Sequence, residues 1–148
     1  MTRRREQARG QPRVEVQFNH ADRRYRPLDD LSVRYEVAGI AGETVRAIEQ
    51  SILWYTEGKG EEDLGVHSFA RITDAGLLPP ASMTGSFGAQ VPTSPLSYEG
   101  VIVKVRWCVR VRIFFEGGRD FVSEHVFDVG SIPPSRPPAR PQPAGAET

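Results

Sequence analysis

The sequence has one cysteine, two lysines and no run of about 18 apolar residues. The single Cys108 excludes an internal disulfide framework and a zinc site built from several cysteines. The lack of a long apolar run excludes a membrane-spanning helix. Residues 1–10 are charged and no apolar stretch follows them, so we expect no secretory signal. These absences favour residence in the cytoplasm.

Charge of either sign is not in excess, because the formal net charge of the 148 residues is zero. The distribution is nevertheless uneven. Residues 1–13 carry five arginines against Glu6, and the central part of the chain is acidic. An acidic body argues against nucleic acid as the main partner. The preference for arginine over lysine indicates the codon bias of a GC-rich bacterial genome.

Helical periodicity is also absent, since no segment repeats apolar residues at helical spacing over more than two turns. The most regular pattern lies in residues 101–115. Odd positions are apolar, from Val101 through Trp107 to Phe115, and the even positions include four cations. Such alternation predicts a strand with one face in a core and one in water. At about 3.3 Å per residue it would run about 50 Å, so it must serve two neighbours or bend.

Similar alternation between turn-forming clusters predicts the other strands. They are Val14–Phe18, Leu31–Val37, Val45–Thr56, Val66–Ile72, Ser86–Val91 and Phe121–Val129. The acidic, glycine-rich loop Glu57–Asp63 is expected to be exposed. The fold class is therefore all-β, an antiparallel immunoglobulin-like sandwich of about seven or eight strands. We expect one domain over residues 14–132, a disordered basic tail over 1–13 and a disordered proline-rich tail over 133–148.

Two turn motifs resemble those of the arrestin-like β-sandwich superfamily. Tyr25-Arg-Pro-Leu-Asp-Asp30 corresponds to a "Y-x-P-G-E" turn, and Val91–Gly100 corresponds to a "P-x-x-P-S-Y/F-x-G" segment that leads into a long strand. The match Ser97-Tyr98-Glu99-Gly100 is the most specific part. Leu28 stands where the family has glycine, and the chain has the size of one lobe, like the N-terminal lobe of an arrestin. The resemblance implies binding to partner proteins and no catalysis.

Four cations form a basic stripe on one face of the long strand: Lys104, Arg106, Arg110 and Arg112. One interpretation is a surface for acidic or phosphorylated peptides, because guanidinium groups bind phosphate in bidentate fashion. The other, which we favour, is a solvated face neutralised across the sheet by Glu36, Glu49, Glu124 or Asp128.

Catalytic and metal-binding patterns are weak. His20, His67 and His125 lie far apart in sequence and lack metal-ligand spacing, although His20 with Asp22 offers a weak metal site in a turn. Cys108 shares the face of the arginines, which would lower its pKa, but an incidental thiol is the simpler interpretation. We predict no enzyme activity, no cofactor and no metal.

Aromatic residues mostly fall on the core face, whereas Ile102 and Phe114 fall on the basic face and belong either to a partner surface or beneath a loop. The function expected is a non-catalytic interaction, scaffolding or adaptor module that recognises a protein segment by a sheet edge or by the basic face. Self-association through an edge is a variant. The alternative is a ligand- or carbohydrate-binding sandwich, which would need exposed aromatics.

Overall fold

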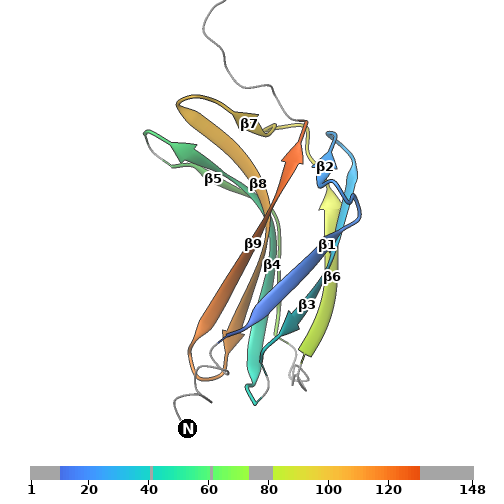
Figure 1. Cartoon of the computed structure of the whole chain (residues 1–148), viewed down its shortest axis with the longest axis vertical. Coiled ribbons are helices and arrows are strands. Elements are labelled where there is room, and N and C mark those ends of the chain that lie inside the picture. Colours follow the sequence, from blue (N-terminus) through green and yellow to red (C-terminus); the bar gives the residue numbers. More distant parts are fainter. Residues whose placement is uncertain (1–10, 41, 61, 74–81, 131–148) are drawn as a thin grey trace, which may run out of the picture.

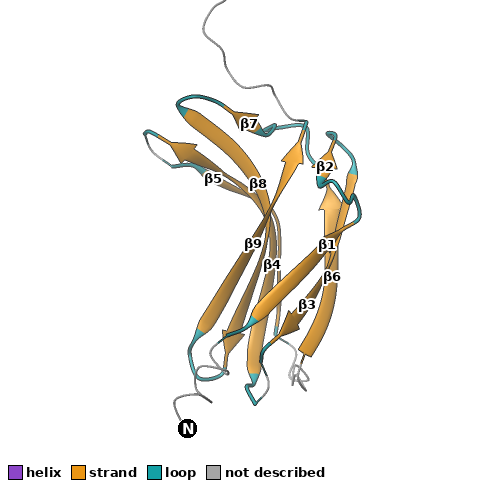
Figure 2. Cartoon of the chain, in the orientation of Figure 1, coloured by secondary structure: helices purple, strands orange, loops and turns teal. Residues whose placement is uncertain are grey.

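The computed structural model describes residues 11–40, 42–60, 62–73 and 82–130, and every regular element within them is a strand (Figures 1 and 2). No helix of these ranges is long and apolar enough to cross a membrane. The strands are β1 (Arg13–Phe18), β2 (Arg24–Tyr25), β3 (Asp30–Ala38), β4 (Val45–Gly58), β5 (Leu64–Ile72), β6 (Ser82–Gln90), β7 (Tyr98–Glu99), β8 (Val103–Phe115) and β9 (Asp120–Val129).

Two sheets pack face to face. The smaller has the order β1-β3-β6, and the larger has the order β2-β9-β8-β4-β5, with β7 added to β8. All pairings are antiparallel except the short one between β2 and β9. The predicted all-β antiparallel sandwich is confirmed, with seven long strands and two of only two residues.

The long strand β8 serves neighbours on both sides, as its length requires. It pairs with β4 from Val103 to Phe115. On its other side it pairs with β9 from Trp107 onward and with β7 at Lys104 and Val105. Figure 1 shows the upper parts of β4, β5 and β8 leaning away from the smaller sheet. One end of the larger sheet therefore projects beyond the sandwich.

The core between the sheets consists of the alternate residues that the period-two pattern assigned to it. One buried cluster surrounds Trp107, Phe127 and Leu31, and the other surrounds Tyr35, Ile48 and Ile113. A buried polar contact crosses the core, where Gln50 Nε2 donates to the Tyr35 hydroxyl at 2.7 Å. Because both groups are satisfied, burying them costs less than burying either alone.

Several predicted boundaries are wrong. Val101 and Ile102 do not belong to the long strand; they form the tip of the β7–β8 hairpin, where the Gly100 N–H donates to the Val103 carbonyl at 3.0 Å. The strand β7 was missed, because two residues give no periodicity. β4 continues through Glu57 and Gly58, which the sequence assigned to a loop.

The expected domain boundaries fall near the ends of the described region. β1 begins at Arg13, one residue inside the expected tail, and Pro12 is already buried. β6 begins at Ser82, four residues earlier than predicted. Residues 1–10 and 131–148, which hold most of the two expected tails, lie outside the described residues.

Candidate functional site

The outer face of the larger sheet carries the four cations of the basic stripe, and each lies beside a carboxylate. Lys104 pairs with Glu99 at 3.0 Å, and Arg106 bridges Glu57 and Glu99. The other two pairs are Arg110–Glu124 at 2.6 Å and Arg112–Asp120 at 2.7 Å. The face therefore presents ion pairs. Binding of an anionic segment there stays a prediction, and the incoming anion would have to displace a carboxylate.

The carboxylates that neutralise the stripe are mostly not those predicted. Only Glu124 was correctly assigned; Glu49 pairs instead with Arg71 on β5 at 2.6 Å. Glu36 lies on β3 in the other sheet, so it cannot reach this face. Asp128 makes no ion pair with the stripe among the described residues, because β9 has already diverged from β8 there. Turn and hairpin residues (Glu57, Glu99 and Asp120) replace them, and their placement depends on a register that the sequence does not reveal.

Phe114, one of the two off-pattern apolar residues, is half-buried beneath cations. The guanidinium groups of Arg71 and Arg112 each lie 4.8 Å from the centre of its ring. Cation–π contacts of this kind stabilise an aromatic ring on a polar face. Phe114 therefore belongs to the charged face and is not an exposed anchor for a partner.

Cys108 occupies the centre of an apolar row that crosses the outer face. Leu53 on β4 and Val126 on β9 flank it, and Cys108 and Leu53 are fully buried. Burial raises the pKa of the thiol to about 12; Glu124 adds to the shift and Arg110 opposes it. Arg110 acts to lower this pKa, as the sequence allowed, but desolvation of the thiolate exceeds its attraction, so the neighbouring arginines do not activate the thiol.

The row continues onto β5, the edge strand on this side of the sheet. Among the described residues β5 pairs with β4 alone, so its other backbone edge is open. It also exposes three large apolar side chains on the outer face: Leu64 (54%), Val66 (55%) and Phe69 (52%). A long edge strand with exposed apolar residues is a template for pairing with another strand. We call this surface the β5 edge.

The hydrogen-bond pattern identifies which backbone groups of β5 face outward. The Thr56 N–H donates to the Asp63 carbonyl at 3.0 Å, so this opposed pair is hydrogen-bonded. Opposed pairs of an antiparallel ladder alternate between bonded and non-bonded. Leu64 opposite Tyr55 and Val66 opposite Leu53 are then the non-bonded pairs. The N–H and C=O groups of Leu64 and Val66 therefore point to the open side.

The open edges of β9 and β6 differ from the β5 edge. The open edge of β9 has Glu124 and the half-buried His125, and Arg23 Nη1 donates to the Val126 carbonyl at 3.5 Å. Burial, reinforced by Arg23, lowers the pKa of His125. β6 has no charged residue, but it also has no large exposed apolar side chain. β9 also exposes Val122 (43%) and Val126 (37%) on the outer face, but Glu124 lies between them. Among these three edges, the β5 edge combines an open backbone with the most exposed apolar side chains.

A depression of about 430 Å³ adjoins the start of β5 on the outer face. Its lining is Tyr55, Thr56, Glu57, Glu62, Asp63, Leu64, Arg110 and Glu124. Glu57 and Glu124 are paired with stripe arginines. Glu62 and Asp63 are exposed and have no ion pair within the described residues, so this end of the β5 edge is negatively charged.

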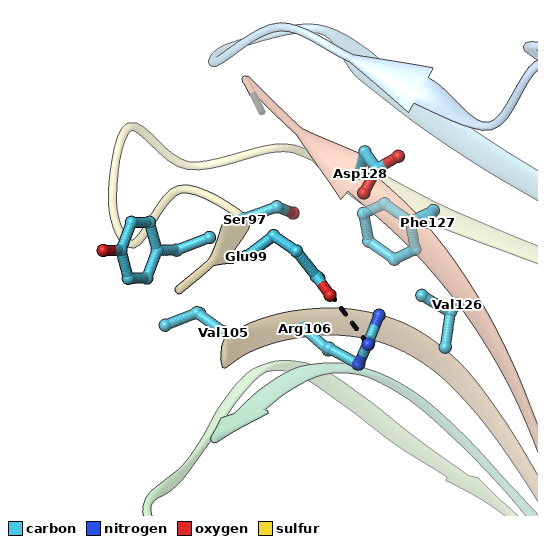
Figure 3. Close-up of a pocket in the computed structure, with 8 residues that line it drawn as sticks. Ser97, Glu99, Val105, Arg106, Val126, Phe127 and Asp128 are labelled. Atoms are coloured by element: carbon cyan, nitrogen blue, oxygen red, sulfur yellow. Dashed lines mark ion pairs between the residues drawn. The ribbon is translucent and has the colours of Figure 1, made fainter. Parts of the chain in front are cut away.

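A second cavity lies where β8 changes partner from β9 to β7 (Figure 3). It measures about 50 Å³ and is crossed by the Arg106–Glu99 ion pair at 3.6 Å. A volume of this size holds one or two water molecules. The cavity is too small for the small-molecule ligands that the alternative function requires.

The three histidines do not converge. His20 stacks on Tyr25 and its Nδ1 contacts the Arg24 carbonyl at 2.8 Å, with no metal-binding cluster near Asp22 or elsewhere in the described ranges. His125 Nε2 contacts the Ser123 hydroxyl at 2.7 Å. His67 lies at the bulge of β5, where its Nε2 contacts the Gln90 carbonyl of β6 at 2.7 Å. It thereby ties the edge of the larger sheet to the smaller one.

Comparison with known proteins identifies a similar fold and nothing further. No protein-family model matches the chain, and no curated protein matches its sequence. The chain is similar in structure to Spo0M, a sporulation control protein from Bacillus subtilis, with a TM-score of 0.61 and 18% sequence identity. The similarity covers 80% of this chain and 49% of Spo0M, so the chain spans about half the length of that protein. At this identity the likeness concerns the fold alone.

Proposed function

We propose that this chain forms an arrestin-like lobe and acts as a non-catalytic protein-interaction module. The proposed mechanism is addition of an extended protein segment to the β5 edge. One observation carries the proposal: β5 has outward-facing backbone groups at Leu64 and Val66, and the same strand exposes three large apolar side chains. Cytoplasmic residence belongs to the same proposal and is supported by the sequence expectation alone.

Strand addition supplies affinity and selectivity from different groups. The outward N–H and C=O groups would bond the backbone of the incoming segment, whatever its sequence. The side chains of Leu64, Val66 and Phe69 would pack against alternate residues of the segment and select apolar ones. Each of the three histidines contacts a different part of the fold, so they give no support to an enzymatic function. Phe69 is the only aromatic among the strongly exposed apolar residues described, which gives a carbohydrate platform little support.

The test compares partner capture from native cells by the wild type, by Val66→Lys and by the matched control Val122→Lys. Val122 is also an exposed outer-face valine on an edge strand of the same sheet, but it lies on β9. An edge lysine opposes strand pairing. A partner retained by the wild type and the control, and lost by Val66→Lys, supports the proposal. Hydrogen exchange of the reconstituted complex should then show protection at the amides of Leu64 and Val66; capture that ignores the β5 substitution refutes it.

A further inference from the structure

The side chains on the outer face of the β5 edge have a polar order along the strand. Glu62 and Asp63 precede it, Leu64, Val66 and Phe69 follow, and Arg71 lies near its end. Acidic residues thus occupy one end, apolar residues the middle and a cation the other end. When two copies of such a strand run antiparallel, the acidic end of each lies beside the cationic end of the other.

From this order we infer that the segment bound at the β5 edge is the β5 strand of a second copy of this chain. The inference rests on the proposed function, because it uses the same open edge. The two strands would run antiparallel and be related by a two-fold axis, which makes the contact isologous and closed. Antiparallel pairing also continues the order of the larger sheet.

The bulge in β5 fixes the register of the match. Val66 opposes Leu53 and Phe69 opposes Ser51, so β5 spends three residues where β4 spends two. The outer-face positions are then 64, 66, 69 and 71. An antiparallel copy centred between residues 67 and 68 brings Val66 opposite Phe69 of the second copy, and Leu64 opposite Arg71. No other centre places outer-face residues opposite one another along the whole strand.

Charge complementarity follows from the same register. Arg71 of each copy would lie beside Leu64 of the other, next to Glu62 and Asp63, whose carboxylates have no ion pair among the described residues. Arg71 holds Glu49 within its own chain, and its side chain remains 40% exposed. It can therefore contact a further carboxylate without leaving Glu49. Two such contacts, one at each end, would set the direction and register of pairing.

Edge-to-edge pairing of nine-residue strands buries a small area, so the dimer should be weak and concentration-dependent. Sedimentation velocity of the full chain, at about 1 to 200 µM, should show a monomer–dimer equilibrium. Val66→Lys should raise the dissociation constant at least about tenfold, whereas the control Val122→Lys should leave it unchanged. Added salt should weaken the dimer through the two terminal contacts.

A charge exchange tests the register directly. Glu62→Lys with Asp63→Lys makes both ends of the β5 edge basic, and Arg71→Glu makes both ends acidic. Each protein alone should be monomeric over the same concentration range, because like charges then meet at both ends. Their equimolar mixture should restore a dimer that contains one copy of each. Glu15→Lys, a change at an exposed residue of β1 in the smaller sheet, is the control for altered net charge.

The outcomes separate this inference from the proposed function. A monomer at all concentrations, with capture of another protein that Val66→Lys abolishes, overturns the second copy as occupant and leaves the function in place. A dimer that ignores Val66→Lys, or a mixture that does not re-form it, also overturns the inference. If no binding depends on Val66, both the inference and the proposed function are refuted.

Discussion

The backbone N–H of Leu28 donates a hydrogen bond of 2.8 Å to the carbonyl oxygen of Val91. The N–H of Val91 in turn donates to the Asp29 carbonyl at 2.8 Å. These contacts join the turn Tyr25–Asp30 to the beginning of the segment Val91–Gly100. The two motifs that suggested the family resemblance, more than 60 residues apart, are therefore neighbours in the fold.

Leu28 has a φ of 73°, a left-handed conformation that strains a residue with a side chain. It stands where the resembled turn has glycine. Leu28→Gly should therefore raise the free energy of unfolding by up to about 1 kcal/mol, since the relieved strain exceeds the entropic cost of glycine in the unfolded chain. Urea denaturation measures this. The side chain is mostly exposed, so little packing is lost; a destabilised Leu28→Gly protein would show that the strain is absent.

Trp107 is 1% exposed, and its Nε1 donates to the Pro95 carbonyl at 2.8 Å. Trp107→Ala should lower the free energy of unfolding by about 3–5 kcal/mol, through the cavity that it leaves. Trp107→Phe should cost less, because most of the ring volume is kept. The remaining cost comes from the Pro95 carbonyl, which loses its hydrogen-bond donor. Denaturation followed by circular dichroism ranks the two. Equal stability of Trp107→Phe and the wild type would mean that the Pro95 contact contributes nothing.

The strand pattern predicted the sandwich because a half-buried strand has apolar residues on the side that faces the core and polar residues on the side that faces water. Alternation in β3 and β8 identified Leu31, Tyr35, Trp107 and Ile113 as core residues, and all four are buried. The same parity placed Cys108 on the polar face, yet it is fully buried. Its neighbours Leu53 and Val126 cover it, and which strands supply neighbours is a property of sheet order that local sequence does not encode.

The β5 edge was beyond the reach of the sequence for a related reason. A pattern predicts that Val66–Ile72 is a strand, but not whether that strand has one neighbour or two. The bulge at His67 also breaks the alternation, so a period-two pattern assigns Val66 and Phe69 to opposite faces. The structure places both on the outer face. The tip residues Val101 and Ile102, 81% and 69% exposed, were misassigned because Val101 continues the run of apolar odd positions in β8.

The basic stripe should contribute little to folding if its ion pairs behave as surface pairs do. In a double-mutant cycle, Arg110→Ala and Glu124→Ala should show a coupling energy below about 1 kcal/mol, because both side chains are partly exposed. The coupling should fall as salt is added. A coupling several times larger would mean that this face is more strongly desolvated than its exposure indicates.

Charge reversal tests whether the stripe also binds an anionic partner. Arg106→Glu with Arg110→Glu places new carboxylates beside Glu57, Glu99 and Glu124, so we expect a lower melting temperature that rises with added salt. If the stripe binds an acidic or phosphorylated segment, capture of that segment should be abolished and should also weaken with salt in the wild type. Capture that persists in the doubly reversed protein and is indifferent to salt excludes the stripe.

Cys108 should make stability depend on pH in the alkaline range. Its folded pKa of about 12 lies above the ordinary value of 9.0, so the folded state keeps its proton while the unfolded chain ionises. Stability from this group is therefore complete below about pH 9 and is lost as the pH rises toward 12. At pH 10 the loss should be on the order of 1 kcal/mol relative to pH 8, by the conversion of one pKa unit. Urea denaturation at the two pH values measures it.

Cys108→Ala is the matched control, because it removes the thiol and leaves the tyrosines that also titrate in this range. The part of the pH dependence that disappears in Cys108→Ala is the contribution of Cys108. The same burial predicts that a thiol reagent will not modify the native protein at neutral pH and will modify it fully in denaturant. Rapid modification of the folded chain, or identical pH profiles for the wild type and Cys108→Ala, would show that the row Leu53–Cys108–Val126 opens to solvent and that the outer face of the larger sheet is not closed over the thiol.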